Sequence, residues 1–293
     1  MINLNYEEII LLDSLIYLNL EAEKGERLLD IIDRSLINNE FTRFININKN
    51  CELEISEYKW KNILYSVKDN FNLNKLKIDD IESRENNINQ ICFIDDYGEV
   101  IVIYKGTSNL SEWDDNAKGA YEYDTEEQIN ALNYIGKLNH ENITVSGHSK
   151  GGNKAQYVSV KKCISINGQG FSNEFLNKYK EEIDKNKYKI ITINSKNDYV
   201  NCLFNSISYE DIYIETKYQI NPLNYHKAEI LLDDNGRLRS KTNESNLTKE
   251  ISKFSTALIS ELPNNIRNLT IDGVMGAVEF FCVMERQMKA LLK

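Results

Sequence analysis

The chain has 293 residues, enough for one large α/β domain with helical additions or for two small domains. Its formal net charge of −10, with no clustered stripe of Lys and Arg, argues against binding to a phosphate backbone, which needs a basic surface. An apolar content of 41% with two prolines and 13 glycines is that of an ordinary folded core and excludes a low-complexity or collagen-like chain.

The beginning of the chain shows no targeting signal. Residues 1–8 lack the basic stretch and the apolar run of a secretory signal peptide. No apolar run anywhere approaches the length that crosses a bilayer. We therefore expect no transmembrane segment and a cytoplasmic protein by default, with leaderless export left open.

The first third of the chain is predicted to form two helical stretches followed by a β-hairpin. Residues 5–37 carry a wide apolar stripe, with Gly25 or its neighbourhood as the point where the helix breaks. A second, weaker helical pattern covers residues 52–70. Apolar segments at 91–94 and 100–104, joined by a turn that contains glycine, predict a β-hairpin.

From residue 125 onwards the predicted helices and strands alternate. The helices are 125–138, 151–162 and 172–185, and the strands are 143–145, 163–166 and 188–193. This alternation indicates an α/β fold with a mainly parallel sheet covered by helices. We expect one domain over residues 1–293, with a catalytic core at about 90–240 and helical additions at 1–75 and 247–293. The last helical stretch has these residues facing inward: Leu258, Ile259, Val274, Val278, Phe281 and Met284.

The cysteines and histidines predict no metal site and no cofactor. Five scattered cysteines without a Cys-x-x-Cys pair are typical of small buried side chains in a reducing compartment. These are Cys51, Cys92, Cys163, Cys202 and Cys282. The three histidines do not pair with them at the spacing of zinc ligands.

A candidate nucleophile follows the strand at 143–145. The sequence Gly147-His148-Ser149-Lys150-Gly151 matches Gly-x-Ser-x-Gly between a predicted strand and a predicted helix. Glycine at 147 and 151 removes Cβ atoms that would collide around a strained serine. The N–H of Lys150, at the positive end of the helix, can donate to an oxyanion. These features predict that Ser149 is the nucleophile of a serine hydrolase.

Two other interpretations of the same segment were weighed. A glycine-rich turn between strand and helix without chemistry is the simplest one. A phosphate-binding loop is the second, because Gly147 and Gly152 have the required separation. That motif continues with Lys and then Ser or Thr, whereas this chain has Asn153 and Lys154, which weakens it.

The partners of Ser149 follow from the chain order of the α/β-hydrolase fold, which is serine, acid, histidine. Only His226 follows Ser149, since His140 precedes the strand and the His148 side chain is expected to point away from the nucleophile. Asp198 comes just after the strongest later strand and is the predicted acid. The alternative acids are Asp211, ranked second, and Asp184, which lies in a helical stretch.

A family resemblance appears in the segment before the nucleophile. Residues 102–109, with Lys105-Gly106-Thr107-Ser108, and the later Trp113-Asp114-Asp115-Asn116 resemble the Phe-Arg-Gly-Thr/Ser and Trp-x-x-Asn segments of class 3 lipases. The chain looks most similar to a bacterial branch of α/β-hydrolases with a Gly-His-Ser-Lys-Gly-Gly-Asn elbow, and the turn at 167–171 also fits. The resemblance covers roughly residues 90–235. It implies that Thr107 supplies the second oxyanion N–H and supports the roles of Ser149, Asp198 and His226.

Three features depart from the class 3 lipase pattern. Lys105 replaces the usual arginine, and Lys154 stands where the branch tends to carry an apolar residue. The loop after Thr107 is short for a large interfacial lid, and we expect its large apolar side chains to be packing residues. These are Leu110, Trp113, Tyr121 and Tyr123.

The resemblance favours hydrolysis of carboxylesters, including lipid esters, through an acyl-enzyme. Thioesters and activated amides stay open because the same machinery cleaves them. Two further hypotheses are a binding module whose catalysis is vestigial and a leaderless exported lipase-type toxin or effector. The expected partner is a small-molecule or lipid ester, without nucleic acid. Residues that could form the acyl pocket or simply pack in the core are Val200, Leu203, Phe204 and Ile207.

Overall fold

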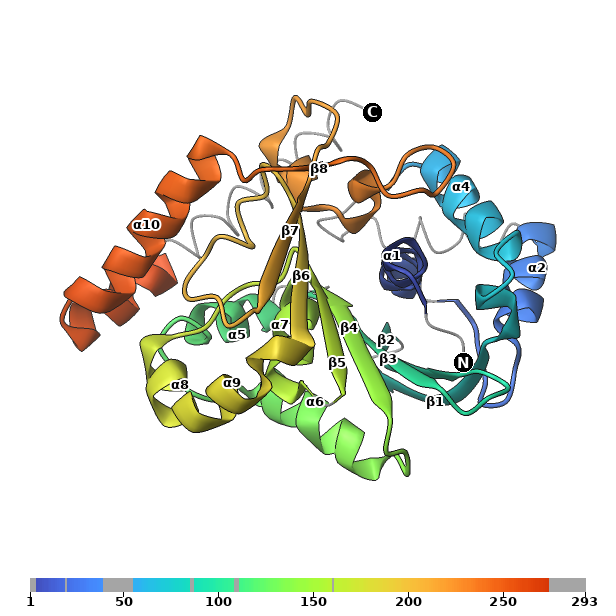
Figure 1. Ribbon diagram of the computed structural model, residues 1–293, viewed down its shortest axis with the longest axis horizontal. Coiled ribbons are helices and arrows are strands. Elements are labelled where there is room, and N and C mark those ends of the chain that lie inside the picture. Colours follow the sequence, from blue (N-terminus) through green and yellow to red (C-terminus); the bar gives the residue numbers. More distant parts are fainter. Residues whose placement is uncertain are drawn as a thin grey trace.

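The computed structural model describes residues 4–18, 20–38, 55–84, 87–107, 111–159 and 161–273. Its centre is an eight-stranded sheet whose strands follow one another in chain order from β1 to β8 (Figure 1). The strands are β1 (Lys77–Arg84), β2 (Asn87–Ile94), β3 (Val100–Tyr104), β4 (Ile143–His148), β5 (Lys162–Ile166), β6 (Ile190–Ser195), β7 (Glu210–Ile214) and β8 (Lys241–Thr242). Strands β3 to β7 are parallel, and β1, β2 and β8 are antiparallel additions at the two edges.

Helices cover both faces of the sheet (Figure 1). One face carries α1 (Tyr6–Leu15), α2 (Leu28–Asn38) and α4 (Glu57–Lys68), together with the short 3-10 helix η1 (Ile16–Leu18). The other carries α5 (Ser111–Lys118), α6 (Glu126–Lys137), α7 (Lys150–Val158), α8 (Asn173–Lys178) and α9 (Lys180–Asn186), and α10 (Asn246–Glu261) extends beyond them. This mostly parallel, helix-covered sheet confirms the predicted α/β fold.

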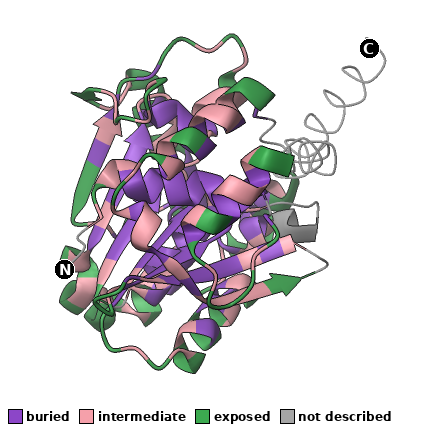
Figure 2. Ribbon diagram, turned by 90° about the vertical axis from the view of Figure 1, so that its right-hand side faces the viewer, coloured by how far each residue is buried: buried purple, intermediate pink, exposed green. Residues whose placement is uncertain are grey.

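The alternation of side chains along the strands divides the core in two. In β3, Ile101 and Ile103 pack with the residues of α1, whereas Val102 and Tyr104 pack with those of α6 and α7. Successive side chains of a strand point to opposite faces, so an apolar run of this kind needs cover on both sides. Figure 2 shows the resulting buried zone in the sheet and the helices against it.

The helical stretch expected at 5–37 breaks near Gly25, as expected. Its first part ends with η1 and the second begins at Leu28, and Gly25 between them has a φ of +91°, a left-handed value that glycine adopts without strain. Other predicted elements are corrected by the structure. The helix expected at 172–185 is interrupted at Tyr179. Strands β1, β7 and β8 and helix α5 were not predicted. Of the C-terminal residues expected to face inward, Ile259 is buried. The others beyond residue 273 lie outside the described residues: Val274, Val278, Phe281 and Met284.

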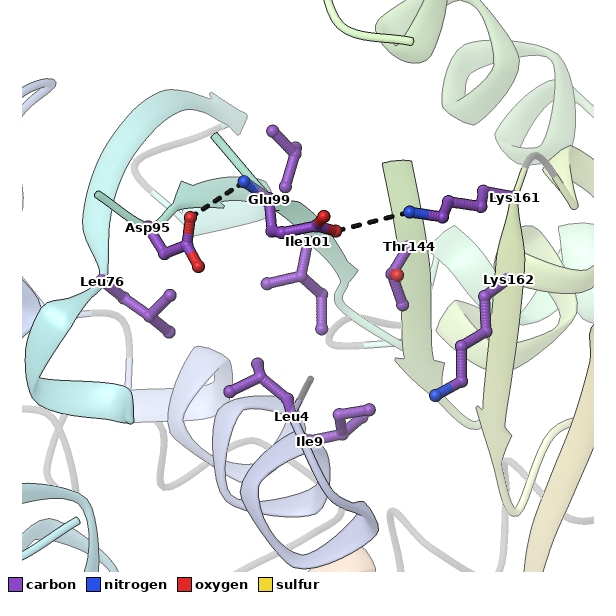
Figure 3. A pocket seen from close by; sticks show the side chains of 10 residues that line it. Leu4, Ile9, Leu76, Asp95, Glu99, Ile101, Thr144, Lys161 and Lys162 are labelled. Carbon is purple, nitrogen blue, oxygen red and sulfur yellow. Dashed lines mark hydrogen bonds and ion pairs between the residues drawn. The ribbon is translucent and has the colours of Figure 1, made fainter. Parts of the chain in front are cut away.

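A cavity of about 320 Å³ opens at the amino ends of the parallel strands (Figure 3). Leu4 and Ile9 lie on one side of it, and Lys162, the first residue of β5, reaches toward it from the other. Ligands of parallel α/β sheets bind beyond the opposite, carboxyl ends of the strands. The candidate site lies at those carboxyl ends and not at this cavity. Across the described ranges, no helix is long and apolar enough to cross a membrane.

Candidate active site

The candidate nucleophile sits on a strained turn between β4 and α7. Ser149 has φ 60° and ψ −126°, and a non-glycine residue takes a positive φ rarely and at a cost. A Cβ added to Gly147 would overlap the carbonyl of Gly151, and one added to Gly151 would overlap the carbonyl of Tyr104. The turn therefore requires glycine at both positions. It leaves Ser149 only partly buried, at the carboxyl edge of the sheet.

Ser149, His226 and Asp198 lie in a hydrogen-bonded row. The Oγ of Ser149 lies 2.8 Å from Nε2 of His226, and Nδ1 of His226 lies 2.9 Å from Oδ1 of Asp198. Asp198 follows β6, and His226 ends the short 3-10 helix η5 (Pro222–His226). Both side chains are buried, so the dielectric around this row is low and its hydrogen bonds are strong.

The carboxylate of Asp198 orients the ring of His226. Asp198 also accepts the backbone N–H groups of Val200 at 3.2 Å and Asn201 at 3.0 Å, which hold the carboxylate in place. A carboxylate accepts hydrogen bonds, so Nδ1 of His226 carries the proton and Nε2 is free to accept the proton of Ser149. The chemical consequence is a base aimed at a serine hydroxyl.

The alternative residues weighed from the sequence lie elsewhere. His140 pairs with Asp79 of β1 at 2.8 Å. The carboxylate of Asp211, the second candidate acid, accepts from Thr192 and Ser208 on the neighbouring strand and loop. Asp184 forms ion pairs with two lysines of its own helical region. None of the three carboxylates or rings contacts Ser149 or His226 in the described part of the chain.

The loop after β3 lies directly against the nucleophile. A Cβ on Gly106 would lie 3.1 Å from the Cβ of Ser149 and 2.6 Å from the carbonyl oxygen of His148, so only glycine allows this approach. The next residue, Thr107, accepts a hydrogen bond on Oγ1 from Nδ2 of Asn116 at 2.8 Å. In the residues that the structure describes, the backbone N–H groups of Thr107 and Lys150 donate to no protein acceptor.

The side chain of Lys150 has a structural partner that the sequence did not reveal. Its Nζ lies 2.6 Å from Oδ2 of Asp115 in α5, and the pair is almost completely shielded from solvent. Burial acts to raise the pKa of Asp115, but the adjacent Lys150 ammonium, together with hydrogen bonds from Thr125 and the backbone of Glu127, holds the pKa below its ordinary value. The ion pair ties α5 to the start of α7, next to the nucleophile.

Asn153 and Lys154, which follow the glycines of the nucleophile turn, connect the start of α7 to neighbouring elements. Nδ2 of Asn153 donates to the carbonyl oxygens of Gln169 at 3.2 Å and Gly170 at 3.1 Å, so it fixes the turn that follows β5. Lys154, which departs from the class 3 lipase pattern, is buried and pairs with Glu127 at 3.4 Å. The charge of Lys154 is thus neutralised by α6, which explains how a lysine occupies a buried position there.

The remaining residues named from the sequence lie partly inside and partly outside the described ranges. Phe204, a candidate for the acyl pocket, packs with Ala117 and Ala120 at the end of α5. The described cysteines, Cys92, Cys163 and Cys202, are buried free thiols; Cys51 and Cys282 lie outside the described residues. Leu110 and the side chain of Trp113 also lie outside them. Within the described ranges, no three His, Cys, Asp or Glu side chains are grouped to hold a metal ion.

The arrangement is that of the α/β-hydrolase fold. The serine turn follows a central parallel strand, the loop after β3 lies beside it, and the chain order is Ser149, Asp198, His226. The sequence placed these residues at one edge of the sheet. Asn116 belongs to the segment that resembles Trp-x-x-Asn, but its contact with Thr107, the pairing of Asp115 with Lys150 and the contacts of His148 were not predicted, since no local pattern signals partners that are distant in the chain.

Comparison with known proteins gives a family and two distant structural likenesses. The family model described as Mbeg1-like matches residues 69–275, more than half of the chain. No curated protein matches the sequence significantly. The Lip2 lipase from Yarrowia lipolytica is similar at 13% identity and a TM-score of 0.37, over 60% of this chain and 76% of that chain. M37 lipase is similar at 14% identity and a TM-score of 0.36, over 68% of this chain and 69% of that chain. Likenesses this weak carry no conclusion about activity.

Proposed function

The chain belongs to the Mbeg1-like family, a lipase-like family with the α/β-hydrolase fold, and on this premise we propose that it is a serine hydrolase of carboxylesters. One observation carries the proposal. Ser149, on a strained turn, is hydrogen-bonded to a buried histidine, which is in turn hydrogen-bonded to a buried aspartate. A serine hydroxyl is a weak nucleophile until such a base removes its proton.

The first half of the reaction forms an acyl-enzyme. Oγ of Ser149 attacks the acyl carbon of the ester while Nε2 of His226 takes the hydroxyl proton. Asp198 stabilises the imidazolium that results. The negative charge that develops on the carbonyl oxygen is met by the N–H groups of Thr107 and Lys150. The C–O bond to the alcohol then breaks, and His226 returns its proton to the departing alkoxide.

The second half releases the acid and restores the enzyme. A water molecule gives a proton to Nε2 of His226 and attacks the acyl carbon, and the same two N–H groups hold the oxyanion again. Collapse of this intermediate breaks the bond to Ser149, and the proton on His226 returns to its Oγ. No group other than the protein side chains and water is needed for the balance of protons.

Membership of a lipase-like family supports a proposal for the substrate class, and we infer acyl esters with an apolar acyl part. A lipase-like site binds an acyl chain next to the nucleophile. The side chains of Phe204 and Leu203 lie after the candidate acid and pack with the end of α5, close in the chain to Asn116, the partner of Thr107. Leu203, the partly buried one of the two, is our candidate for contact with an apolar acyl group.

A fluorophosphonate probe tests the proposal directly, because it phosphonylates only a serine activated by its own base. We expect wild-type protein to be labelled and to hydrolyse a chain-length series of nitrophenyl esters. Ser149→Ala should abolish labelling and lower hydrolysis by about 10⁴-fold or more. Ser206→Ala, which changes an exposed serine outside the site, is the matched control and should react as the wild type does. Folded wild-type protein that stays unlabelled would instead support a binding module.

A further inference from the structure

His148, the residue before the nucleophile, is completely buried on the α1 side of β4. Its ring contacts the main chain of the candidate base. Nε2 of His148 lies 2.6 Å from the carbonyl oxygen of His226, and Nδ1 lies 2.9 Å from Oη of Tyr17 in η1. The two imidazole rings pack with their centroids 4.8 Å apart. His148 therefore bridges the N-terminal helical segment and the loop that carries His226.

The protons of this bridge follow from the chemistry of its atoms. Burial lowers the pKa of His148 to about 3, with a smaller contribution from His226, so its ring is neutral at ordinary pH and carries one N–H. The carbonyl oxygen of His226 can only accept, so that proton is on Nε2. Nδ1 then accepts the hydroxyl proton of Tyr17. The Tyr17 oxygen in turn accepts the backbone N–H of Gly106 at 3.2 Å.

The bridge matters because His226 lies on a long irregular segment. Between the end of β7 at Ile214 and the start of β8 at Lys241 the chain forms only short 3-10 helices. The carbonyl of His226 is held by two donors, Nε2 of His148 and Nδ2 of Asn167 at 3.0 Å. A side chain on a loop is placed accurately only when packing and hydrogen bonds fix the backbone that bears it.

We propose that His148 and Tyr17 are positioning residues, which hold the main chain of His226 so that its ring stays between Asp198 and Ser149. The same chain of hydrogen bonds reaches Gly106, beside the oxyanion donor Thr107, so one unit sets the base and the oxyanion loop together. This inference rests on the proposed hydrolase function. Tyr17 lies outside residues 69–275, so the N-terminal segment completes a site that the family-matched region only partly contains.

Four variants separate this role from a general effect on folding. His148→Leu removes the donor to His226, and His148→Gln restores an amide N–H at a similar position. Tyr17→Phe removes only the hydroxyl. Tyr157→Phe is the matched control, since it removes a tyrosine hydroxyl that donates to Asp124 at 2.8 Å, away from the site. Thermal unfolding followed by circular dichroism establishes that each variant is folded before its kinetics are compared.

The expected result is a loss in kcat with little change in KM, because a displaced base impairs the transition state and not ester binding. His148→Leu should lower kcat and the rate of fluorophosphonate labelling by about a hundredfold, the size of effect that a shift of about 1 Å produces. Tyr17→Phe should lower both by about tenfold, and His148→Gln should recover most of the activity. Tyr157→Phe should leave both unchanged.

A spectroscopic measurement adds a readout that a merely structural role would not move. ¹⁵N-histidine NMR should show His148 as the neutral Nε2–H tautomer, and the Nδ1 proton of His226 should shift in His148→Leu. If the wild type is labelled, and His148→Leu and Tyr17→Phe show the same kcat and labelling rate as the wild type, the positioning role is wrong but the hydrolase function stands. A folded but unlabelled wild type would refute the proposed hydrolase function and with it this role.

Discussion

At the scale of single residues, the turn around Ser149 needs close contacts between backbone atoms that larger side chains at its glycine positions would prevent. A serine at φ 60° is strained by about 1–3 kcal/mol, so its surroundings must hold it there. The N–H of Ser149 donates to the carbonyl of Ile166 at 2.9 Å, which anchors the turn to β5. Gly147 and Gly151 allow the carbonyls around the turn to approach without collision. These contacts concern folding, so they can be tested without any assay of activity.

Replacing Gly151 by alanine should destabilise the folded protein, because the new Cβ overlaps the carbonyl of Tyr104 and backbone must move. We expect the free energy of unfolding to fall by about 1–3 kcal/mol, the usual cost of overpacking, and activity to be lost with it. Gly136→Ala in α6 is the control, since its Cβ meets nothing within 4 Å. Alanine there should raise stability by about 0.5–1 kcal/mol. Urea denaturation measures the free energy of unfolding of both variants. Equal changes in Gly151→Ala and Gly136→Ala would contradict the geometry of the turn.

Which residues the sequence could predict depends on how local their signals are. Ser149 and its glycines form a short motif, and the fixed chain order left His226 as a single eligible base. Tyr17 could not be predicted, since it meets His148 across 131 positions in the chain and no pattern links them. His148 was expected to point away from the nucleophile. Its contact with the His226 carbonyl depends on loop geometry that the sequence does not encode locally.

At the scale of elements, the strands and helices with a strong apolar pattern were predictable and the polar ones were not. The buried strands β3 to β6 and helix α6 all correspond to predicted segments. β1 lies at the edge of the sheet and carries five charged residues, with Ile78 as its one buried side chain. α5 is short and mostly polar, and it is held by the Lys150–Asp115 pair. Edge strands and polar helices gain their stability from tertiary partners, which periodicity does not show.

The relation of the N-terminal helices to the sheet leads to a prediction about cooperativity. Leu12 of α1 is 1% exposed and belongs to the same apolar cluster as Ile103 of β3. We propose that these helices and the sheet unfold as one domain. Leu12→Ala should lower the free energy of unfolding by about 2–5 kcal/mol and leave a single transition. The exposed Leu132→Ala in α6 is the control, with an expected change of less than about 0.5 kcal/mol.

Circular dichroism and tryptophan fluorescence distinguish one unit from two. Circular dichroism reports on all helices and strands. In a Trp113→Phe background, which removes the second tryptophan of the chain, fluorescence of the buried Trp60 of α4 reports on the N-terminal helices. Coincident transitions that shift together in Leu12→Ala would agree with one domain. A fluorescence transition that shifts while most of the circular dichroism transition stays in place would show that the helical addition is a separate unit.

At the scale of the whole molecule, two buried groups between α1 and β4 make stability depend on pH in opposite directions. The pKa of His148 is about 3 in the folded protein and about 6.5 in the unfolded chain. The unfolded chain therefore binds a proton that the folded protein lacks, and stability falls as the pH drops from about 6.5 toward 3. For Asp13, burial raises the pKa of the carboxyl well above 3.8, only partly offset by a hydrogen bond with Ser146. The folded protein then keeps a proton that the unfolded chain releases, and stability falls as the pH rises above about 4.

The hydrogen bonds around Asp13 agree with a protonated carboxyl group. The hydroxyl of Ser146 is hydrogen-bonded to Oδ2 of Asp13 and lies 2.8 Å from the carbonyl oxygen of Ile164. A hydroxyl has one proton, and a carbonyl can only accept, so that proton goes to Ile164 and the carboxyl supplies the other. An asparagine amide N–H can replace this carboxyl proton without adding a titratable group.

Asp13→Asn should therefore be more stable than the wild type near neutral pH, by a margin that grows as the pH rises from about 4. The slope of the difference is at most about 1.4 kcal/mol per pH unit, the value for one proton. Urea denaturation at a series of pH values from 3 to 8 measures it, and below pH 4 the difference between the two proteins should become constant. The loss of stability between pH 6.5 and 4 that comes from His148 is present in both proteins and cancels in the difference. Curves that run parallel over the whole range would show that Asp13 ionises in the folded protein as it does in the unfolded chain.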